Sequence, residues 1–112
     1  MAYDHELAER IRRLLDESGH DAVERKMFGG LAFMVNDRMA VVASGRGGLM
    51  ARVADSIAEE LVETTPATVA EMRGRPMKGW LRIPSDHVST TQALKPWVLR
   101  AMAHAEAQPR RS

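Results

Sequence analysis

Between residues 23 and 53, apolar side chains recur at every second position, and this period of two is the spacing of β-strands. The alternation is clearest in three segments, residues 31–35, 39–43 and 49–53. An earlier strand over about residues 23–28 would enter the sheet through Gly29 and Gly30, at a bulge or a tight turn. Asn36 and Asp37 have the length and residue types of a two-residue hairpin loop, because both tolerate positive φ angles. The pattern therefore predicts four strands in an antiparallel meander.

A period of 3.6 residues precedes the meander and returns after it. The first helix is predicted from Asp4 to Ser18, where Asp4 can cap the first turn and Gly19 can end the last one. Its apolar stripe consists of Leu7, Ile11, Leu14 and Leu15. Together these periods predict an α/β fold of the α+β type, in which an antiparallel sheet is flanked by an N-terminal and a C-terminal helix.

Two capping-box patterns mark the starts of further helices. The segment Ser56–Glu59 has this spacing, and Pro66 should interrupt the chain soon afterwards. The segment Ser89–Gln92 has it as well, and apolar residues continue from there at helical spacing to Ala105. Pro96 lies inside this last pattern, so we expect a kink or a delayed start of the helix near it.

The chain between these two helices is predicted to contain one strand and one undecided segment. The strand runs from Trp80 to Ile83, bounded by Gly79 and Pro84. Residues 68–72 fit either a strand or a loop. The length of 112 residues predicts a single domain, which we assign to residues 1–107 with a flexible tail at 108–112.

The amino-acid composition limits the classes of function that this protein can have. The 16 Lys and Arg residues nearly balance the 15 Asp and Glu residues, so electrostatic binding must come from local clustering. The chain has no cysteine, which excludes disulfides, thiol catalysis and thiolate metal ligands. The polar start of the sequence does not resemble a signal peptide, and no run reaches the roughly 20 apolar residues of a membrane span. We therefore expect a cytoplasmic protein with no membrane contact.

The residue patterns of common enzyme sites are not found. The four histidines are scattered without metal-ligand spacing, so we expect neither a metal nor another cofactor. The glycines at 29–30 and 45–48 are more simply explained as turns than as phosphate-binding loops. Asp86 beside His87 could act as an acid–base pair, but a polar loop before the last helix is favoured because no nucleophile is near in sequence. We expect no catalytic residues and no enzymatic activity, with a small-molecule enzyme as the least favoured alternative.

Methionine and aromatic residues present a choice between core and binding surface. Six methionines lie in the central segment: Met27, Met34, Met39, Met50, Met72 and Met77. Such flexible side chains can form an adaptable partner surface, but we expect them to fill the core because few aromatic residues are available to do so. Four aromatic residues are expected to pack between sheet and helices: Phe28, Phe33, Trp80 and Trp97. The alternative for Trp80 is stacking on a nucleic-acid base.

Basic residues are the best candidates for a binding site. The proposed partner-binding residues are Lys26, Arg52, Arg73, Arg75, Lys78 and Arg82. Four of them lie between residues 73 and 82, and they would form a positive patch if this segment crosses the sheet near Lys26 and Arg52. Such a patch could contact phosphates, an acidic protein surface or a small anion. The competing interpretation is that Arg52, Arg75 and Lys78 pair internally. Their partners would be Glu24, Glu59, Glu60 or Glu71.

Three segments of the chain share the order and approximate separation of motifs in a known family. They are Lys-Met-Phe-Gly-Gly-Leu-Ala-Phe at 26–33, Leu-Met-Ala-Arg-Val at 49–53 and Gly-Arg-Pro-Met-Lys-Gly-Trp at 74–80. In this combination the sequence resembles the N-terminal domain of the TfoX/Sxy family over nearly its whole length. The resemblance implies an antiparallel sheet flanked by helices, a two-layer arrangement similar to that of YjbR-like proteins. No catalytic residues are carried over from the family.

The resemblance also implies a role in regulation. Two-domain members of the family are associated with natural competence, as co-activators alongside a cyclic-AMP receptor protein. This sequence corresponds to the first domain alone, so we expect a stand-alone module that binds a protein partner, such as a transcription factor. A weak nucleic-acid-binding domain that uses a local basic patch is the alternative from the residues themselves.

Overall fold

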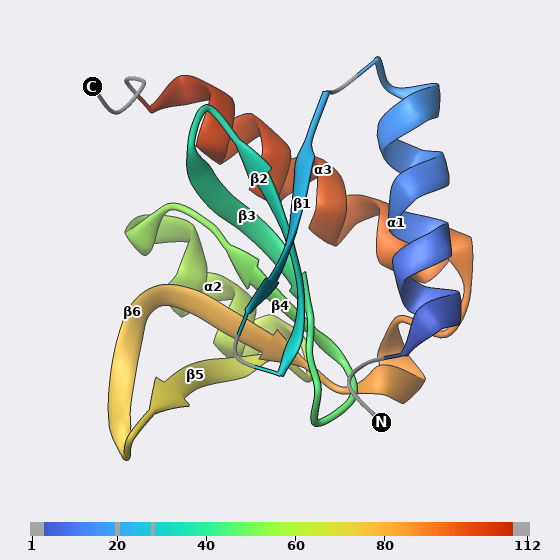
Figure 1. Ribbon diagram of the computed structural model, residues 1–112. Coiled ribbons are helices and arrows are strands. Elements are labelled where there is room, and N and C mark those ends of the chain that lie inside the picture. The colour runs from blue at the N-terminus through green and yellow to red at the C-terminus, as the bar shows by residue number, and fades with distance from the viewer. Residues whose placement is uncertain (1–3, 20, 28, 109–112) are drawn as a thin grey trace.

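Three α-helices and a six-stranded sheet make up the described part of the chain (Figure 1). The computed structural model describes residues 4–19, 21–27 and 29–108. Its elements in chain order are α1 (His5–Glu17), β1 (Val23–Met27), β2 (Gly30–Val35), β3 (Arg38–Ala43), β4 (Leu49–Arg52), α2 (Asp55–Thr64), β5 (Thr68–Met72), β6 (Arg75–Ile83), the short 3-10 helix η1 (Ser85–His87) and α3 (Thr91–Ala107). None of the described helices is long and apolar enough to cross a membrane. Residues 109–112 of the expected tail lie outside the described residues.

All neighbouring strands are antiparallel, in the order β1-β2-β3-β4-β6-β5. The first four strands form the predicted meander, which confirms the α+β class. The chain then departs from a simple meander, because β6 pairs with β4 and leaves β5 at the edge of the sheet. Residues 68–72, undecided from the sequence, form a strand because β6 supplies the hydrogen-bonding partner on one side.

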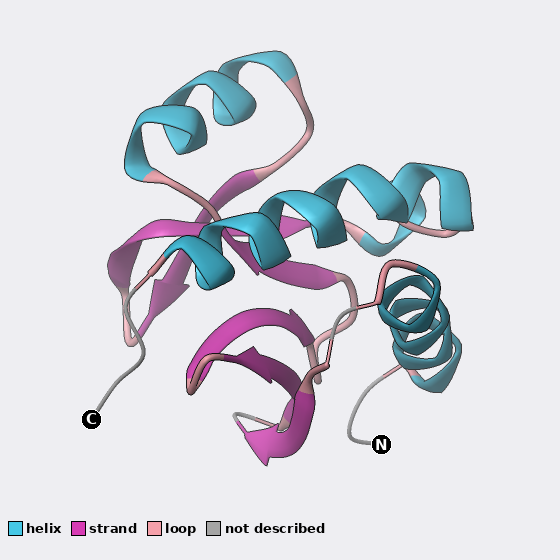
Figure 2. Ribbon diagram, turned by 90° about the horizontal axis from the view of Figure 1, so that it is seen from above, coloured by secondary structure: helices cyan, strands magenta, loops and turns pink. Residues whose placement is uncertain are grey.

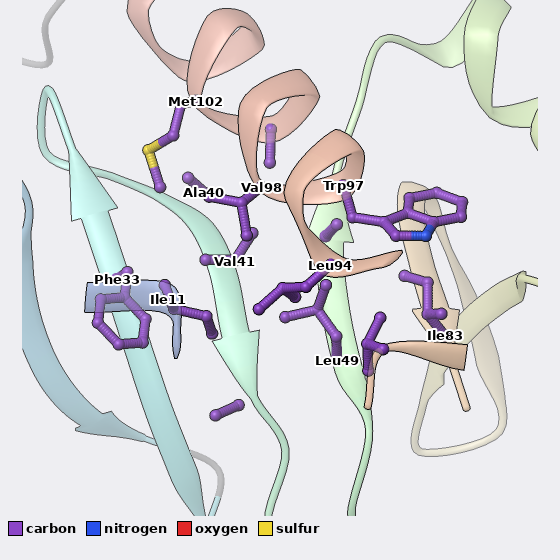
Figure 3. Close-up of a cluster of buried hydrophobic side chains, with 14 of the residues drawn as sticks. Ile11, Phe33, Ala40, Val41, Leu49, Ile83, Leu94, Trp97, Val98 and Met102 are labelled. Carbon is purple, nitrogen blue, oxygen red and sulfur yellow. The ribbon is translucent and has the colours of Figure 1, made fainter. Parts of the chain in front are cut away.

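The helices bury one face of the sheet. Alternate residues of the central strands, among them Phe33, Val41 and Leu81, lie in one continuous core with side chains from all three α-helices. Figure 2 shows α2 and α3 on the same side of the curved sheet. Figure 3 shows Leu94 and Val98 of α3 packed against the strands. The intervening strand residues point to the opposite side, here called the open face.

The first helix begins and ends where the sequence predicts. The Asp4 carboxylate accepts hydrogen bonds from the backbone N–H groups of Glu6, at 3.0 Å, and Leu7, at 3.2 Å. These are donors that no carbonyl within the helix can reach. Gly19 follows the last turn with a φ of 73°, the left-handed conformation that commonly ends a helix. The predicted apolar stripe of α1 is buried.

Two tight turns set the register of β1, β2 and β3. Asn36 and Asp37 have φ angles of 54° and 63°, as the predicted two-residue loop requires. The turn before β2 contains Gly29, whose φ is 74°. Gly30 is needed for a different reason, because a Cβ atom there would collide with the carbonyl oxygen of Ala43 on β3. The predicted tight entry into the sheet is therefore confirmed.

The start of α2 differs from its prediction. The N-cap residue is Ala54, which has no side-chain hydrogen bond to the helix, and Ser56 is already the second helical residue. The predicted capping box is thus wrong. An acidic residue, Asp55, occupies the first turn instead, where the helix dipole favours negative charge. The helix ends at Thr64, two residues before Pro66, as predicted.

The start of α3 is shifted by one residue from its prediction. The side chain of Thr90, and not that of Ser89, accepts the N–H of Ala93 at 3.1 Å and caps the helix. The helix includes Pro96, so a delayed start is wrong. Buried side chains before and after the proline pack against the sheet and offset the lost backbone hydrogen bond.

The last strand is longer than predicted. It begins at Arg75 rather than near Trp80, and Gly79 lies inside it with a φ of 83°. A Cβ atom on Gly79 would collide with the guanidinium group of Arg52 on β4. The glycine thus permits a close crossing within the strand instead of marking its start.

The methionines of the central segment whose side chains are described are not in the core, so for them that prediction is wrong. Five of them are half-buried: Met27, Met34, Met39, Met50 and Met77. The side chain of Met72 lies outside the described residues. Because neighbouring residues of a strand face opposite sides, the smaller Val, Ala and Leu residues of β2 to β4 face the helices and most of these methionines alternate with them.

The aromatic residues are divided between the core and the open face. Phe33 and Trp97 are buried in the core, as predicted. Trp80 is only half-buried and pairs in register with Arg52, one position away from the core-facing Leu81. The core assignment of Trp80 is therefore wrong. The corresponding expectation for Phe28 lies outside the described residues.

Candidate functional site

The six basic residues predicted to form one binding face are spread across the sheet. Lys26 lies on β1, at one edge of the sheet. Arg73 and Arg75 lie at the turn between β5 and β6, at the other edge, and all three are exposed. The remaining three lie on β4 and β6: Arg52, Lys78 and Arg82. The strand order therefore separates these cations into three locations rather than one stripe.

One acidic residue, Asp55, contacts two of these last three cations, Arg52 and Lys78. The Nη1 atom of Arg52 donates a hydrogen bond to the backbone carbonyl of Lys78 and lies 3.9 Å from Oδ1 of Asp55. The Nζ atom of Lys78 lies 3.7 Å from the other Asp55 carboxylate oxygen. Internal pairing of Arg52 and Lys78 is therefore found, but with Asp55 and not with one of the four glutamates considered from the sequence.

Arg82 supports the loop between β3 and β4. Its Nη1 atom donates to the hydroxyl of Ser44 at 3.3 Å, and its Nη2 atom donates to the carbonyl of Gly47 at 3.1 Å. The side chain is half-buried. These contacts explain Arg82 as a structural residue.

Glu24, one of the proposed acidic partners, is held by α1. Its carboxylate receives two hydrogen bonds from Arg12, at 2.7 Å from Nε and 2.8 Å from Nη2. This two-point contact lowers the pKa of Glu24 below its usual value and raises that of the Arg12 guanidinium above its own. The pair ties α1 to the edge strand β1.

A cavity of about 490 Å³ opens where β3 and β4 separate. These strands pair over only three positions, from Val41–Ala51 to Ala43–Leu49, so the start of β3 and the end of β4 diverge. Residues of the open face and of the last turn of α3 line the opening. We call it the β3–β4 cavity, and its principal lining residues are Met34, Met39, Arg52, Lys78, Trp80 and His104.

The cavity has a positive character near α3. Burial lowers the pKa of His104 below its usual value, and the nearby charges of Arg52 and Arg38 lower it further. Asp55 acts in the opposite sense. Burial first, and then the two arginine charges, therefore favour the neutral imidazole.

A second hollow, of about 660 Å³, lies between α2 and the β5–β6 hairpin. We call it the α2–β5 groove. Val62, Val69 and Pro76 provide apolar lining, and Val69 has 41% of its surface exposed. Glu59 and Glu63 of α2 also line the groove, and neither carboxylate has an ion-pair partner among the described residues. Asp55 and Lys78 line it as well and pair with each other, so the groove combines an apolar lining with two acidic side chains, Glu59 and Glu63, that are not neutralised.

The described residues provide little for metal or acid–base chemistry. Within residues 4–19, 21–27 and 29–108, no group of three or more His, Cys, Asp or Glu side chains could hold a metal ion. Asp86 and His87 lie on η1 with 3.9 Å between Oδ2 and Nε2, and both side chains are exposed.

Several residues of these sites were not identified from the sequence. Asp55 was not considered, His104 was only one of four scattered histidines, and Val69 lay in the undecided segment 68–72. An acidic residue in the first turn of α2, three positions after Arg52, is a signal that could have revealed the Arg52–Asp55 pair. The position of His104 beside β3 depends on how α3 crosses the sheet, which local sequence does not encode.

The chain belongs to the TfoX N-terminal domain family. The model of that family matches residues 13–105, from within α1 to the end of the core-forming part of α3. The match includes the whole sheet and all residues that line the α2–β5 groove, and it confirms the resemblance inferred from the three sequence segments. Membership supports a small module of regulatory type. No curated protein matches the sequence.

Proposed function

We propose that this protein is a cytoplasmic regulatory module that acts by binding a protein partner, without catalysis. The observation that carries the proposal is the α2–β5 groove, whose apolar lining is open to solvent beside the edge strand β5. Exposed apolar side chains beside an unpaired sheet edge support a protein interaction site there. The family resemblance to co-activators supports a partner from the transcription apparatus.

The charge of the groove defines the partner segment. Glu59 and Glu63 would be complemented by Lys or Arg side chains, and Val62 and Val69 by apolar ones. We therefore propose a short basic, amphipathic segment of the partner as the occupant. This assignment replaces the patch of cations expected from the sequence, because those cations are dispersed and two of them are engaged with Asp55.

The experiment uses matched substitutions on and off the groove. Val69→Lys changes a groove residue, whereas Ile57→Lys changes a residue of α2 with a similar exposure of 42% outside the groove lining. Glu63→Lys and Glu60→Lys form a second pair, because Glu60 is exposed on the same helix but does not line the groove. A photocrosslinking residue at position 62 would identify the partner in source cells.

Binding of the purified partner to each variant is then measured by calorimetry. We expect Val69→Lys and Glu63→Lys to weaken binding at least tenfold, while Ile57→Lys and Glu60→Lys retain it. Equal affinities within both pairs would overturn the groove as the binding surface. Loss of binding on Arg73→Ala with Arg75→Ala, two cations outside the groove lining, with the groove variants unaffected, would instead favour a cationic face. A partner that proves to be nucleic acid, with affinity falling steeply with salt, would replace the proposal with the alternative function.

A further inference from the structure

We propose that the β3–β4 cavity is a binding site for a small organic anion with a flat aromatic body. Of the residues that line it, only Lys78 also lines the α2–β5 groove, and the site does not depend on the proposed protein partner. Its volume of about 490 Å³ falls within the range of small-molecule pockets, which is roughly 300–1,000 Å³.

The cavity exists because of the sheet geometry. Arg38 and Met39 begin β3 before its pairing with β4 starts, and Arg52 ends β4 after that pairing has finished. The last turn of α3 lies across the resulting gap and contributes His104. The walls therefore come from five strands and from α3, all held by the core, which is typical of a preformed site.

The apolar wall suits a flat ring. Trp80 presents a large aromatic surface that is half-buried, and Met34 and Met39 lie at paired positions of β2 and β3 beside the same cavity. Aromatic rings stack on tryptophan, and methionine thioethers pack favourably against ring edges. The flexible methionine side chains can adjust to the outline of a ligand.

The cationic wall suits a negatively charged group. The contacts of Arg52 within the described chain involve only its Nη1 atom, so the Nε and Nη2 donors have no protein acceptor there. Its link to the Lys78 carbonyl fixes the guanidinium in place before a ligand arrives. Arginine with two donors on one edge can bind a phosphate or carboxylate through paired hydrogen bonds.

Lys78 adds a second charge at the rim, with 85% of its side chain exposed. The acidic groups near this region are Asp55, already paired with both cations, and Asp37, which also lines the cavity. His104 faces Arg52, Arg38 and Asp55, and its lowered pKa is consistent with a site where an anion would relieve repulsion.

The test uses three probes that measure the contributions of the apolar wall and the cationic wall to binding separately. 1-Naphthyl phosphate carries both the ring system and the anion, 1-naphthol carries only the ring system, and inorganic phosphate carries only the anion. Binding is followed by two-dimensional NMR of the full chain, with the indole N–H of Trp80 and the imidazole of His104 as reporters. The indole of Trp97, buried in the core, reports on folding.

We expect 1-naphthyl phosphate to shift the Trp80 and His104 signals and to bind at least tenfold more tightly than either other probe. The pKa of His104 should rise on binding, because the added negative charge favours the imidazolium. Arg52→Gln should weaken the binding of 1-naphthyl phosphate at least tenfold. Arg75→Gln, which removes a cation at the β5–β6 turn, should leave this binding unchanged.

If Arg52→Gln proves unfolded by the Trp97 signal, Trp80→Leu provides the second variant, since Trp80 is outside the core. This variant should weaken the binding of 1-naphthyl phosphate at least tenfold and leave the Trp97 signal unchanged. Equal binding of 1-naphthyl phosphate and 1-naphthol would overturn the anion site. So would unchanged binding by a folded Arg52→Gln or Trp80→Leu variant, or shifts confined to the α2–β5 groove.

Discussion

Replacing Gly30 with alanine is expected to destabilise the protein more than the same change at Gly47. The expectation is not the obvious one, because Gly47 has a φ of 87°, where alanine is strained, and Gly30 does not have a positive φ of this kind. What distinguishes Gly30 is its surroundings. A Cβ atom there would collide with the carbonyl oxygen of Ala43 and lie 3.1 Å from the backbone nitrogen of Gly45.

The size of the destabilisation depends on which atoms can shift to relieve the collision. Both colliding atoms belong to the backbone of β3 and its following loop, so relief requires a shift of the β2–β3 ladder. Forcing extra atoms into such a site typically costs about 1–3 kcal/mol, and we expect the upper end at Gly30. At Gly47 no atom lies within 4 Å of the added Cβ. The cost there is the left-handed strain of about 1–2 kcal/mol, reduced by a gain of about 0.4–1 kcal/mol from the less flexible unfolded chain.

The assay is urea unfolding of the wild type and both variants, with thermal unfolding as a second measurement. For a domain of this size, each 1 kcal/mol corresponds to a shift of about 4 °C or more in Tm. We expect Gly30→Ala to lower the Tm by roughly three times as much as Gly47→Ala. Equal losses, or a larger loss at Gly47, would show that backbone conformation rather than close packing fixes this turn.

Two further predictions concern packing and charge. Trp97→Ala should lower the free energy of unfolding in urea by about 3–5 kcal/mol, because it empties a core site. Trp80→Ala should lower it by only about 1 kcal/mol, because that side chain is half-exposed. Comparable losses would show that Trp80 belongs to the core. The Arg12–Glu24 pair should stabilise the protein fully above the unfolded pKa of glutamate, about 4.3, and lose that effect as pH falls through the lower folded pKa. The difference in unfolding free energy between wild type and Arg12→Met should therefore shrink from pH 6 to pH 3, and a difference independent of pH would contradict this account.

Local chemistry made much of the fold predictable. The Asp4 cap, the Asn36-Asp37 turn and the period of two each act within a few residues, so the sequence predicted α1 and the β1–β4 meander closely. The length of β6 was missed for a different reason. Its first residues are held by pairing with β5, and the conformation of Gly79 makes sense only with Arg52 passing beside it.

The main error of the sequence prediction was the choice of which strand face meets the helices. The same choice determines which residues line the β3–β4 cavity. The alternation predicted which residues share a face, but not that the methionines alternate with the residues that meet the helices. The cations were identified as candidates, yet their grouping depended on strand order, which placed β1 and β5 at opposite edges. His104 joins the site only because α3 meets the sheet there, so no local pattern could reveal it.

The two edges of the sheet differ in their capacity to pair with another chain. Glu24, Arg25 and Lys26 stand in succession on β1, so their charges alternate between the two sides of that strand. A foreign strand aligned with β1 would have to desolvate ionic groups both above and below the growing sheet, which discourages fibril-like stacking of copies. The other outer strand, β5, presents Val69 and Ala70 between Thr68 and Glu71 and has a much lower barrier of this kind. The sheet therefore resists extension from one end while remaining receptive at the other.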